Sequence, residues 1–217
     1  MKVILFGATG MVGQAVLREC LLDDGVEAVL AVGRRAAGVA HPKLRELIRA
    51  DLFDFTAPAT ELAGYDACFF CLGVSSAGMG EAEYTHLTYD LTMGWALALA
   101  RINPSLTFCY VSGAGTGGKA MWARAKGRTE TALLTLFPHA YMVRLAALLP
   151  LHGETPRVRW ARIGYAVARP LLPLIRALAP NAVVTTEELG RAMIRVARQG
   201  AAKRVLESGD LRALGAR

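Results

Sequence analysis

The chain has 217 residues, of which 53% are hydrophobic and 7% aromatic, and its composition excludes a disordered or low-complexity protein. Its length is enough for one domain with a sizeable core. The formal net charge of +7 comes from the last third, because residues 144–217 hold 13 Lys and Arg against 5 Asp and Glu. This basic excess is either a solvated face or a contact for an anionic partner such as acidic lipid. No nucleic-acid motif accompanies it, so no nucleic acid is expected.

Short apolar strands alternate with helices through the first two thirds of the chain. Runs of β-branched and aromatic residues predict strands, and apolar residues at helical spacing predict helices. This alternation predicts an α/β fold with a doubly wound parallel sheet covered on both faces. The strands are expected at 2–6, 26–32, 44–50, 67–72, 106–111 and 140–148, and the helices at 11–22, 81–100 and 120–136.

The last part of the chain is expected to be small and mostly helical. Thr185 and Glu188 form a capping-box pattern that predicts a helix over 187–198, and a short strand is expected at 203–207. The apolar run 163–180 contains arginines and prolines and is shorter than the ~20 apolar residues of a membrane span. We interpret it as broken, half-buried helices, with an interfacial amphipathic segment as the alternative. Residues 1–217 are thus expected to form a single domain, with about 150–183 as a substrate or cap region.

The four cysteines are interpreted as free thiols. Cys68 and Cys71 form a CxxC pattern, but they lie in a run predicted to be a buried strand, where residues three apart point to opposite faces. No second CxxC or His pair completes a zinc site, so no metal is expected. The apolar start of the chain leads directly into a glycine-rich turn and is interpreted as a strand. A reducing cytoplasm is therefore the expected location.

A glycine-rich turn is expected between the first strand and the first helix. The glycines are spaced GxxGxxG, which permits a tight turn and lets the backbone approach a pyrophosphate. The amides at the helix N-terminus then bind the anion. Because the motif follows a strand, opens a helix and heads an alternating α/β chain, it predicts a dinucleotide site. The residues assigned to this turn are Gly7, Ala8, Thr9, Gly10, Met11, Val12 and Gly13.

The residues after the later strands extend this site. An NAD-binding site usually has an acidic residue after the second strand, about 20 residues beyond the glycines, for the ribose 2′-hydroxyl. Arg34 and Arg35 stand there instead, and guanidinium groups pair with a 2′-phosphate. We therefore predict NADP(H) in preference to NAD(H), with two solvated arginines as the alternative. Asp51 is placed to accept a hydrogen bond from adenine. The other residues expected beside the cofactor are Leu52, Leu72, Gly73 and Val74.

Six motifs of the first 150 residues occur together. They are GATGMVG at 7–13, GRR at 33–35, DL at 51–52, CLG at 71–73, VSGAG at 111–115 and the lysine of WARAKG at 122–127. With these motifs, the chain resembles the extended or atypical branch of the short-chain dehydrogenase/reductase superfamily over about residues 1–150. This resemblance implies a Rossmann fold that binds NAD(P)(H), with reductase, epimerase or dehydratase activity. Some members of such families have lost catalysis and serve as nucleotide-sensing regulators.

The resemblance also assigns catalytic roles to three positions. Ser112 matches the serine that polarises the substrate oxygen, and Lys126 matches the lysine that binds the nicotinamide ribose and lowers the pKa of a tyrosine. That tyrosine belongs four residues before the lysine, where this chain has Trp122. An indole donates a hydrogen bond or stacks on a ring, but it cannot take up a proton. The candidates for the missing acid are water, Tyr84, Tyr89 and His152.

Two functional hypotheses remain open. The first is an NADP(H)-dependent oxidoreductase acting on a small carbonyl or alcohol substrate. The second is a catalytically silent NADP(H)-binding sensor or scaffold. A weak contact with an anionic membrane surface through residues 157–180 is compatible with either, and a homodimer through the helices at 81–100 and 120–136 is a further expectation.

Overall fold

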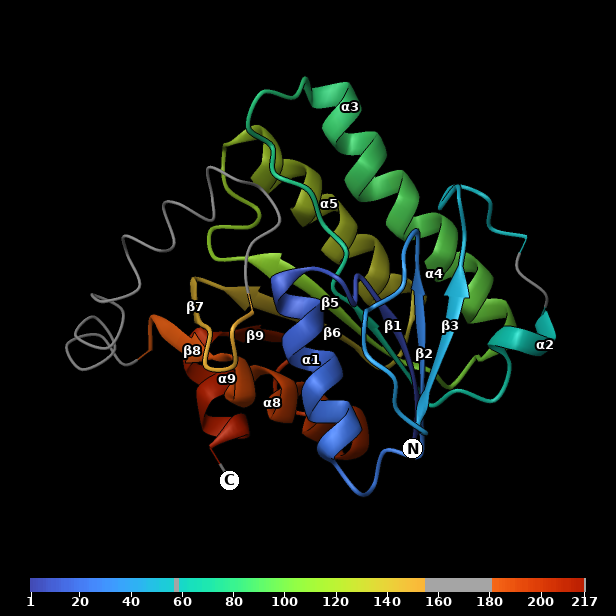
Figure 1. Ribbon diagram of the computed structural model, residues 1–217. Helices are drawn as coiled ribbons and strands as arrows, with labels where there is room; N and C mark the ends of the chain where they lie inside the picture. The colour runs from blue at the N-terminus through green and yellow to red at the C-terminus, as the bar shows by residue number, and fades with distance from the viewer. Residues whose placement is uncertain (57–58, 155–180, 217) are drawn as a thin grey trace.

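A computed structural model describes residues 1–56, 59–154 and 181–216 (Figure 1). Its centre is a parallel sheet of seven strands in the order β3-β2-β1-β4-β5-β6-β9. The order reverses between β1 and β4, as in doubly wound Rossmann sheets, which confirms the predicted fold class. The strands are β1 Lys2–Phe6, β2 Ala28–Gly33, β3 Leu44–Ile48, β4 Ala67–Phe70, β5 Thr107–Gly113, β6 Ala140–Leu145 and β9 Val205–Glu207.

Helices cover both faces of the sheet (Figure 1). The side chains of β1 alternate between two cores, so that Val3 and Leu5 pack toward one layer and Ile4 and Phe6 toward the other. This alternation explains why the strand is apolar throughout. The first layer contains α1 Met11–Leu22, α8 Thr186–Gln199 and α9 Ser208–Gly215, and the second contains α4 Leu91–Ile102 and α5 Met121–Leu136.

The helix predicted at 81–100 is one continuous helical segment with an irregular centre. It consists of α3 Glu81–Thr85, a π-helical turn at His86–Asp90 and α4, which ends at Ile102 just before Asn103 and Pro104. The backbone amide of Leu91 bonds to the carbonyl of His86, five residues back. A separate short helix, α2 Ala59–Leu62, precedes β4.

The strand predicted at 140–148 is divided in the structure. β6 ends at Leu145, and the next amide, that of Ala146, donates to Ser208 Oγ at 3.1 Å instead of continuing the sheet. β7 Ala147–Leu149 then pairs in parallel with β8 Val183–Thr185 as a second, two-stranded sheet. The predicted strand at 26–32 also begins later, at Ala28. The segment 163–180 lies outside the described residues, and so does most of the predicted cap region.

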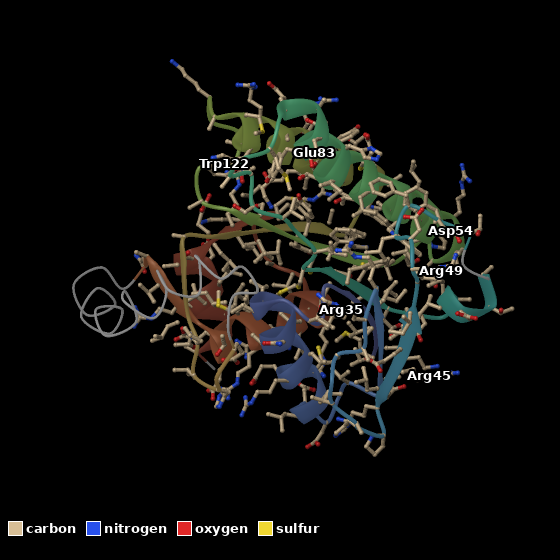
Figure 2. All side chains as sticks on the ribbon, turned by 45° about the horizontal axis from the view of Figure 1, so that its top comes forward. Arg35, Arg45, Arg49, Asp54, Glu83 and Trp122 are labelled. Atoms are coloured by element: carbon tan, nitrogen blue, oxygen red, sulfur yellow. The ribbon has the colours of Figure 1, made fainter. Side chains whose placement is uncertain are left out.

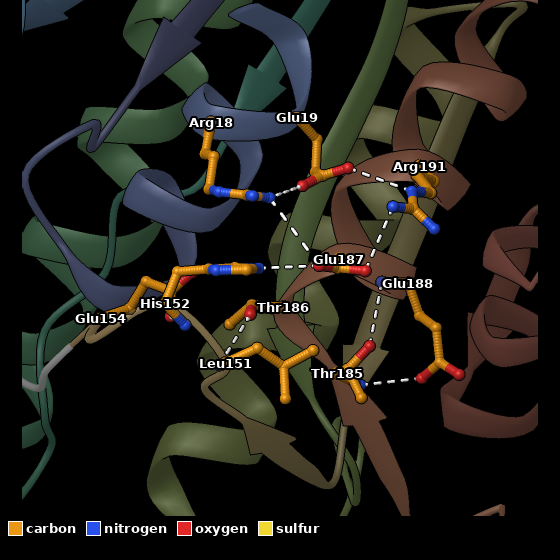
Figure 3. Close-up of polar contacts among 10 residues, drawn as sticks. All are labelled: Arg18, Glu19, Leu151, His152, Glu154, Thr185, Thr186, Glu187, Glu188 and Arg191. Atoms are coloured by element: carbon orange, nitrogen blue, oxygen red, sulfur yellow. Dashed lines mark hydrogen bonds and ion pairs between the residues drawn. The ribbon is translucent and has the colours of Figure 1, made fainter. Parts of the chain in front are cut away.

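The predicted capping box opens α8 (Figure 3). Glu188 donates its amide to Thr185 Oγ1 at 3.1 Å, and Thr185 donates its amide to Glu188 Oε2 at 2.9 Å. No helix in the described part of the chain is long and apolar enough to cross a membrane.

Most of the basic side chains that the structure describes in the last third are engaged within the molecule. Arg191 pairs with Glu19 at 3.1 Å (Figure 3), and Arg198 pairs with Asp23 across the α1–α8 contact. Arg204 donates to three backbone carbonyls at the β5–β6 side of the sheet. The described part of the basic excess therefore has structural partners, and the arginines at 157–176 lie outside the described residues.

Candidate functional site

The glycine turn after β1 is too tight for side chains at two positions. Gly7 has a φ of +81°, and a Cβ there would lie 2.8 Å from the backbone of Cys71. A Cβ on Gly13 would lie 2.0 Å from the carbonyl oxygen of Gly7. Gly10 caps α1 without a side chain, and the first turn of α1 has no acidic residue. The turn therefore packs the backbone of Gly7 against the first turn of α1. The exposed amides and the dipole at this helix N-terminus favour a bound anion.

A cleft of about 440 Å³ opens above this turn, at the carboxyl ends of β1, β2 and β4. This is the point where the strand order reverses, which is where doubly wound sheets bind ligands. The predicted cofactor residues that line it are Gly7, Ala8, Thr9, Gly10, Arg34, Arg35, Leu52, Leu72, Gly73 and Val74. Sequence reasoning missed further lining residues, including Cys71, Ser75, Ala77 and Met79.

Five predicted cofactor residues do not line the cleft, namely Lys126, described below, and four residues near the glycine turn and the end of β3. Met11 and Val12 pack against the core under α1, and Gly13 supports the turn from below. Asp51 is exposed, and its Oδ1 accepts the amide of Phe53 at 2.8 Å. The next residue, Leu52, enters the cleft wall, while its carbonyl accepts the buried Trp95 indole N–H at 2.8 Å. Asp51 therefore shapes the loop beside the cleft.

Arg34 and Arg35 directly follow β2, and both line the cleft (Figure 2 labels Arg35). Both are exposed, and neither has a hydrogen-bond or ion-pair partner among the described residues. Their neighbour Arg49 differs, because it pairs with Asp54 at 2.5 Å (Figure 2). Two adjacent cations that no described side chain neutralises thus line the cleft.

The three predicted catalytic residues lie at the carboxyl end of β5, the strand next to β4. Trp122 and Lys126 are one turn apart on α5, and a Cβ added at Gly113 or Gly115 would lie 3.7 Å from the Trp122 ring. The indole therefore covers the loop that follows β5 (Figure 2 labels Trp122). Ser112, Trp122 and Lys126 do not line the 440 Å³ cleft.

Lys126 extends along the surface of β5. Its Nζ lies 3.5 Å from the carbonyl oxygen of Val111 and 5.4 Å from the centroid of the Tyr110 ring. Burial lowers the pKa of Lys126 from 10.5 to about 8, and the negative charge of Glu130 partly opposes this shift. A lysine in this setting exchanges its proton close to neutral pH.

Glu130 is a residue of this region that sequence reasoning missed. It is 3% exposed and accepts the Ser112 hydroxyl at 2.6 Å. Arg144, at the end of β6, contacts both carboxylate oxygens at 2.5–3.2 Å, and this pairing raises the pKa of Arg144. The available signal was an acidic residue four positions after Lys126, on the helix face that meets the sheet.

The candidates for the missing acid are all engaged elsewhere in the fold. Tyr84 is 2% exposed in α3, and burial raises its pKa. Tyr89 lies with its ring 4.9 Å from the Arg128 guanidinium. His152 Nε2 lies 2.7 Å from Glu187 Oε1 at the start of α8 (Figure 3). None of the three lines the cleft.

The CxxC cysteines point to opposite cores, as their spacing predicts. Cys68 belongs to the core under α4, and Cys71 packs against the core under α1. Burial raises the pKa of both thiols well above the usual range. All four cysteines are free, and no described cluster of three His, Cys, Asp or Glu is arranged to hold a metal ion.

The fold and the cleft together define a doubly wound α/β protein, with a glycine turn of the phosphate-binding type at the point where the strand order reverses. In line with this, residues 3–134 match the NAD dependent epimerase/dehydratase family. The match covers more than half of the chain, and the chain belongs to this family.

Two curated relatives and two solved structures illustrate the similarity. Protein FMP52 of Chaetomium globosum is 29% identical over 67% of this chain and 65% of its own length. Rat HTATIP2 is 26% identical over 84% of this chain and 81% of its own length. The Bordetella bronchiseptica enzyme WbmH in complex with NAD+ has a TM-score of 0.67 at 18% identity, covering 94% of this chain and 74% of WbmH. UDP-glucuronic acid 4-epimerase from Bacillus cereus has a TM-score of 0.68 at 12% identity, covering 95% and 76%. At these identities, the structures show a shared fold.

The curated relatives correct one expectation from the sequence. FMP52 of Chaetomium globosum and its counterparts from Scheffersomyces stipitis and Candida albicans are named as mitochondrial proteins. These names contradict the cytoplasmic location that the absence of an export signal led us to expect. The cysteine pattern that supported it distinguishes oxidising from reducing compartments and does not separate two reducing ones.

Proposed function

We propose that this chain binds NADP(H) in the cleft above the glycine turn and is an oxidoreductase acting on a small alcohol or carbonyl substrate. The observation that carries the proposal is the pair Arg34 and Arg35, which are exposed in the cleft wall and have no partner among residues 1–56, 59–154 and 181–216. A nucleotide with a 2′-phosphate supplies the anion that this pair lacks.

The rest of the cleft fits a dinucleotide. Gly7 and Gly13 keep the turn free of side chains, so a pyrophosphate can approach the backbone there. The start of α1 lies beside the turn, and its N-cap Gly10 has no side chain to bond the first amides of the helix. The structure of WbmH in complex with NAD+ supports a nicotinamide dinucleotide as the class of ligand. Lys126, at the neighbouring strand end, is proposed to hold the nicotinamide ribose. The chemistry that the bound cofactor supplies is hydride transfer.

The test is a titration with NADPH and NADH, followed by nicotinamide fluorescence. Replacing Arg34 and Arg35 by alanine removes charge-assisted hydrogen bonds of about 1.5–3 kcal/mol each, so NADPH affinity should fall at least about tenfold. NADH affinity should change little. Arg45→Ala is the matched control, because Arg45 is exposed on β3 and does not line the cleft (Figure 2). Equal losses for both nucleotides would contradict the NADP(H) preference.

A second candidate function is favoured by Trp122. Because an indole cannot take up a proton, the chain is alternatively an NADP(H)-binding sensor without turnover. Trp122→Tyr distinguishes the two candidates when assayed with a panel of aldehydes, ketones and alcohols. Activity that appears only in this variant supports the sensor, whereas activity of the unmodified chain supports the enzyme.

A further inference from the structure

The polar side chains at the end of β5 are organised by one buried carboxylate. Ser112 donates its hydroxyl to Glu130, and Arg144 holds Glu130 from the other side. We infer that Glu130 makes the Ser112 hydroxyl an acceptor toward the substrate, and that Lys126 takes the proton of an alcohol substrate in place of the absent tyrosine. This inference rests on the proposed function, because it assigns the substrate class and the proton path of the same site.

The direction of the Ser112 hydrogen bond determines what the serine offers to a ligand. A hydroxyl has a single proton and two lone pairs, and the Ser112 proton is given to Glu130 Oε1 at 2.6 Å. The carboxylate is paired with Arg144 at 2.5 Å and accepts hydrogen bonds only. Ser112 therefore has only lone pairs left, and its partner on the substrate must be a donor. A hydroxyl group meets this requirement, and a carbonyl oxygen does not.

Lys126 is the group on this face of α5 that is able to accept a proton. Trp122, one turn earlier, is a donor only, and Glu130, one turn later, is occupied by Ser112 and Arg144. Lys126 Nζ forms no ion pair with a described residue, and it contacts the Val111 carbonyl and the Tyr110 ring.

The charged and titratable groups around Lys126 act in known directions. Glu130 on α5 stabilises the ammonium form, and burial disfavours it more strongly, so the pKa falls to about 8. Tyr110 on β5 and Tyr84 on α3 stay neutral, because burial raises the pKa of both phenols. The charge of Arg144 on β6 is paired with Glu130. A neutral Lys126 amine is therefore accessible slightly above neutral pH.

The resulting proton transfer is balanced. The carbinol carbon loses a hydride to the oxidised cofactor, while the single hydroxyl proton, shared between Ser112 Oγ and Lys126 Nζ before the transfer, passes to the Nζ of neutral Lys126. The products are a carbonyl compound, the reduced cofactor and an ammonium group, which then releases its proton to water. Glu130 is a positioning residue in this scheme, because it acts through Ser112 and through the charge that it presents to Lys126.

The first test measures Lys126 itself and needs no substrate. The rate at which an amine-acylating reagent modifies each lysine is followed by mass spectrometry from neutral to alkaline pH. Lys126 should titrate near 8, and Glu130→Gln should lower this midpoint because it removes the charge that stabilises the ammonium form. The control Glu81→Gln changes an exposed carboxylate that pairs with Arg124, and should leave the midpoint unchanged. The inference would be overturned if Lys126 had the same titration midpoint as the exposed Lys119, or if Glu130→Gln left the midpoint of Lys126 unchanged.

The second test measures turnover of primary and secondary alcohols with NADP+. Lys126→Arg keeps a cation for the ribose but does not give up its proton near neutral pH. NADP+ affinity should stay within severalfold, while turnover falls about 100-fold or more, as expected for a lost acid–base group. Lys119→Arg is the matched control and should act like the unmodified chain.

The outcomes separate the two levels of the proposal. If the unmodified chain binds no NADP(H), the proposed function is wrong. If it binds NADP+ but oxidises no alcohol, or if Lys126→Arg keeps full turnover, the assignment of the alcohol and of Lys126 is wrong while the cofactor site stands. Turnover of the unmodified chain that rises with pH through a midpoint of about 8 supports the assignment. In Glu130→Gln, the same rise should have its midpoint at a lower pH.

Discussion

The cofactor cleft and the end of β5 meet ligands in opposite ways. The cleft presents backbone and two arginines that have no partner in the described part of the chain, so its groups are open to a ligand. At the end of β5, Glu130 accepts hydrogen bonds from Ser112 and Arg144. A ligand there can use only the lone pairs and protons that are not already engaged in these hydrogen bonds. The first region is suited to an anion that can be recognised by charge. The second selects a ligand by the direction of its hydrogen bonds.

The largest effect is expected from closing the glycine turn. Gly13→Ala places a Cβ 2.0 Å from the Gly7 carbonyl oxygen, which no side-chain movement relieves. NADPH binding should be lost, and the free energy of unfolding should fall by several kcal/mol, on the order of the largest single-residue effects. Fluorescence titration and urea unfolding measure the two quantities. Gly10→Ala is the control for the unfolding measurement alone, because Gly10 lines the cleft but its Cβ would lie 3.5 Å from its nearest neighbour. An equal loss of unfolding free energy in both variants would refute the backbone argument.

The next effect concerns the buried carboxylate. Glu130→Ala leaves Arg144 with Glu207 at 3.4 Å as its remaining acidic partner and leaves the Ser112 hydroxyl without its acceptor. Breaking a buried ion pair in this way costs about 3–5 kcal/mol of unfolding free energy. Glu81→Ala removes an exposed pair with Arg124 and should cost less than about 1 kcal/mol. If urea unfolding gave similar losses of unfolding free energy for Glu130→Ala and Glu81→Ala, the buried pair of Glu130 with Arg144 would not stabilise the fold more than the exposed pair.

The third prediction is a pH dependence of stability that originates from Lys126. Its pKa is near 8 in the folded chain and near 10.5 when unfolded, so between these values the unfolded chain binds more protons. Stability relative to Lys126→Met should therefore rise from pH 8 to 10.5, by at most about 3 kcal/mol, and stay flat below pH 8. Unfolding curves at several pH values measure this difference, and a flat profile throughout would contradict the burial of the ammonium group.

The smallest effect is expected away from both regions. His152 and Glu187 form a pair at 2.7 Å with side chains 34% and 28% exposed, and the contact lowers the pKa of Glu187. His152→Ala should cost less than about 1 kcal/mol of unfolding free energy, and less still at high salt. NADPH affinity should not change. A marked loss of NADPH affinity would place His152 in the site and blur the comparison.

The cofactor cleft is the part that local sequence patterns predicted best. Gly7, Gly10 and Gly13 have a role defined by neighbours in the chain, and the ends of β1, β2 and β4 follow from the alternation of apolar runs. The glycine motif and the predicted strand ends together therefore identified most of the lining residues.

The end of β5 could not be predicted in the same way. Glu130 acquires its role from Arg144 on another strand, and the break after β6 depends on Ser208, 62 residues later. Likewise, Arg198 pairs with Asp23 across 175 positions of sequence. Partnerships at such distances are decided by tertiary packing and leave no periodic signal.

The small β7–β8 sheet has a consequence for how the last helices are attached. Ala147 pairs with Val183 and Leu149 with Thr185, so the residues just after β6 are joined to the strand that leads into α8. Thr185 is both the last residue of β8 and the residue whose side chain caps α8. The two-stranded sheet therefore acts as a clamp on the start of α8, and a substitution that breaks its pairing should loosen the first turn of that helix as well.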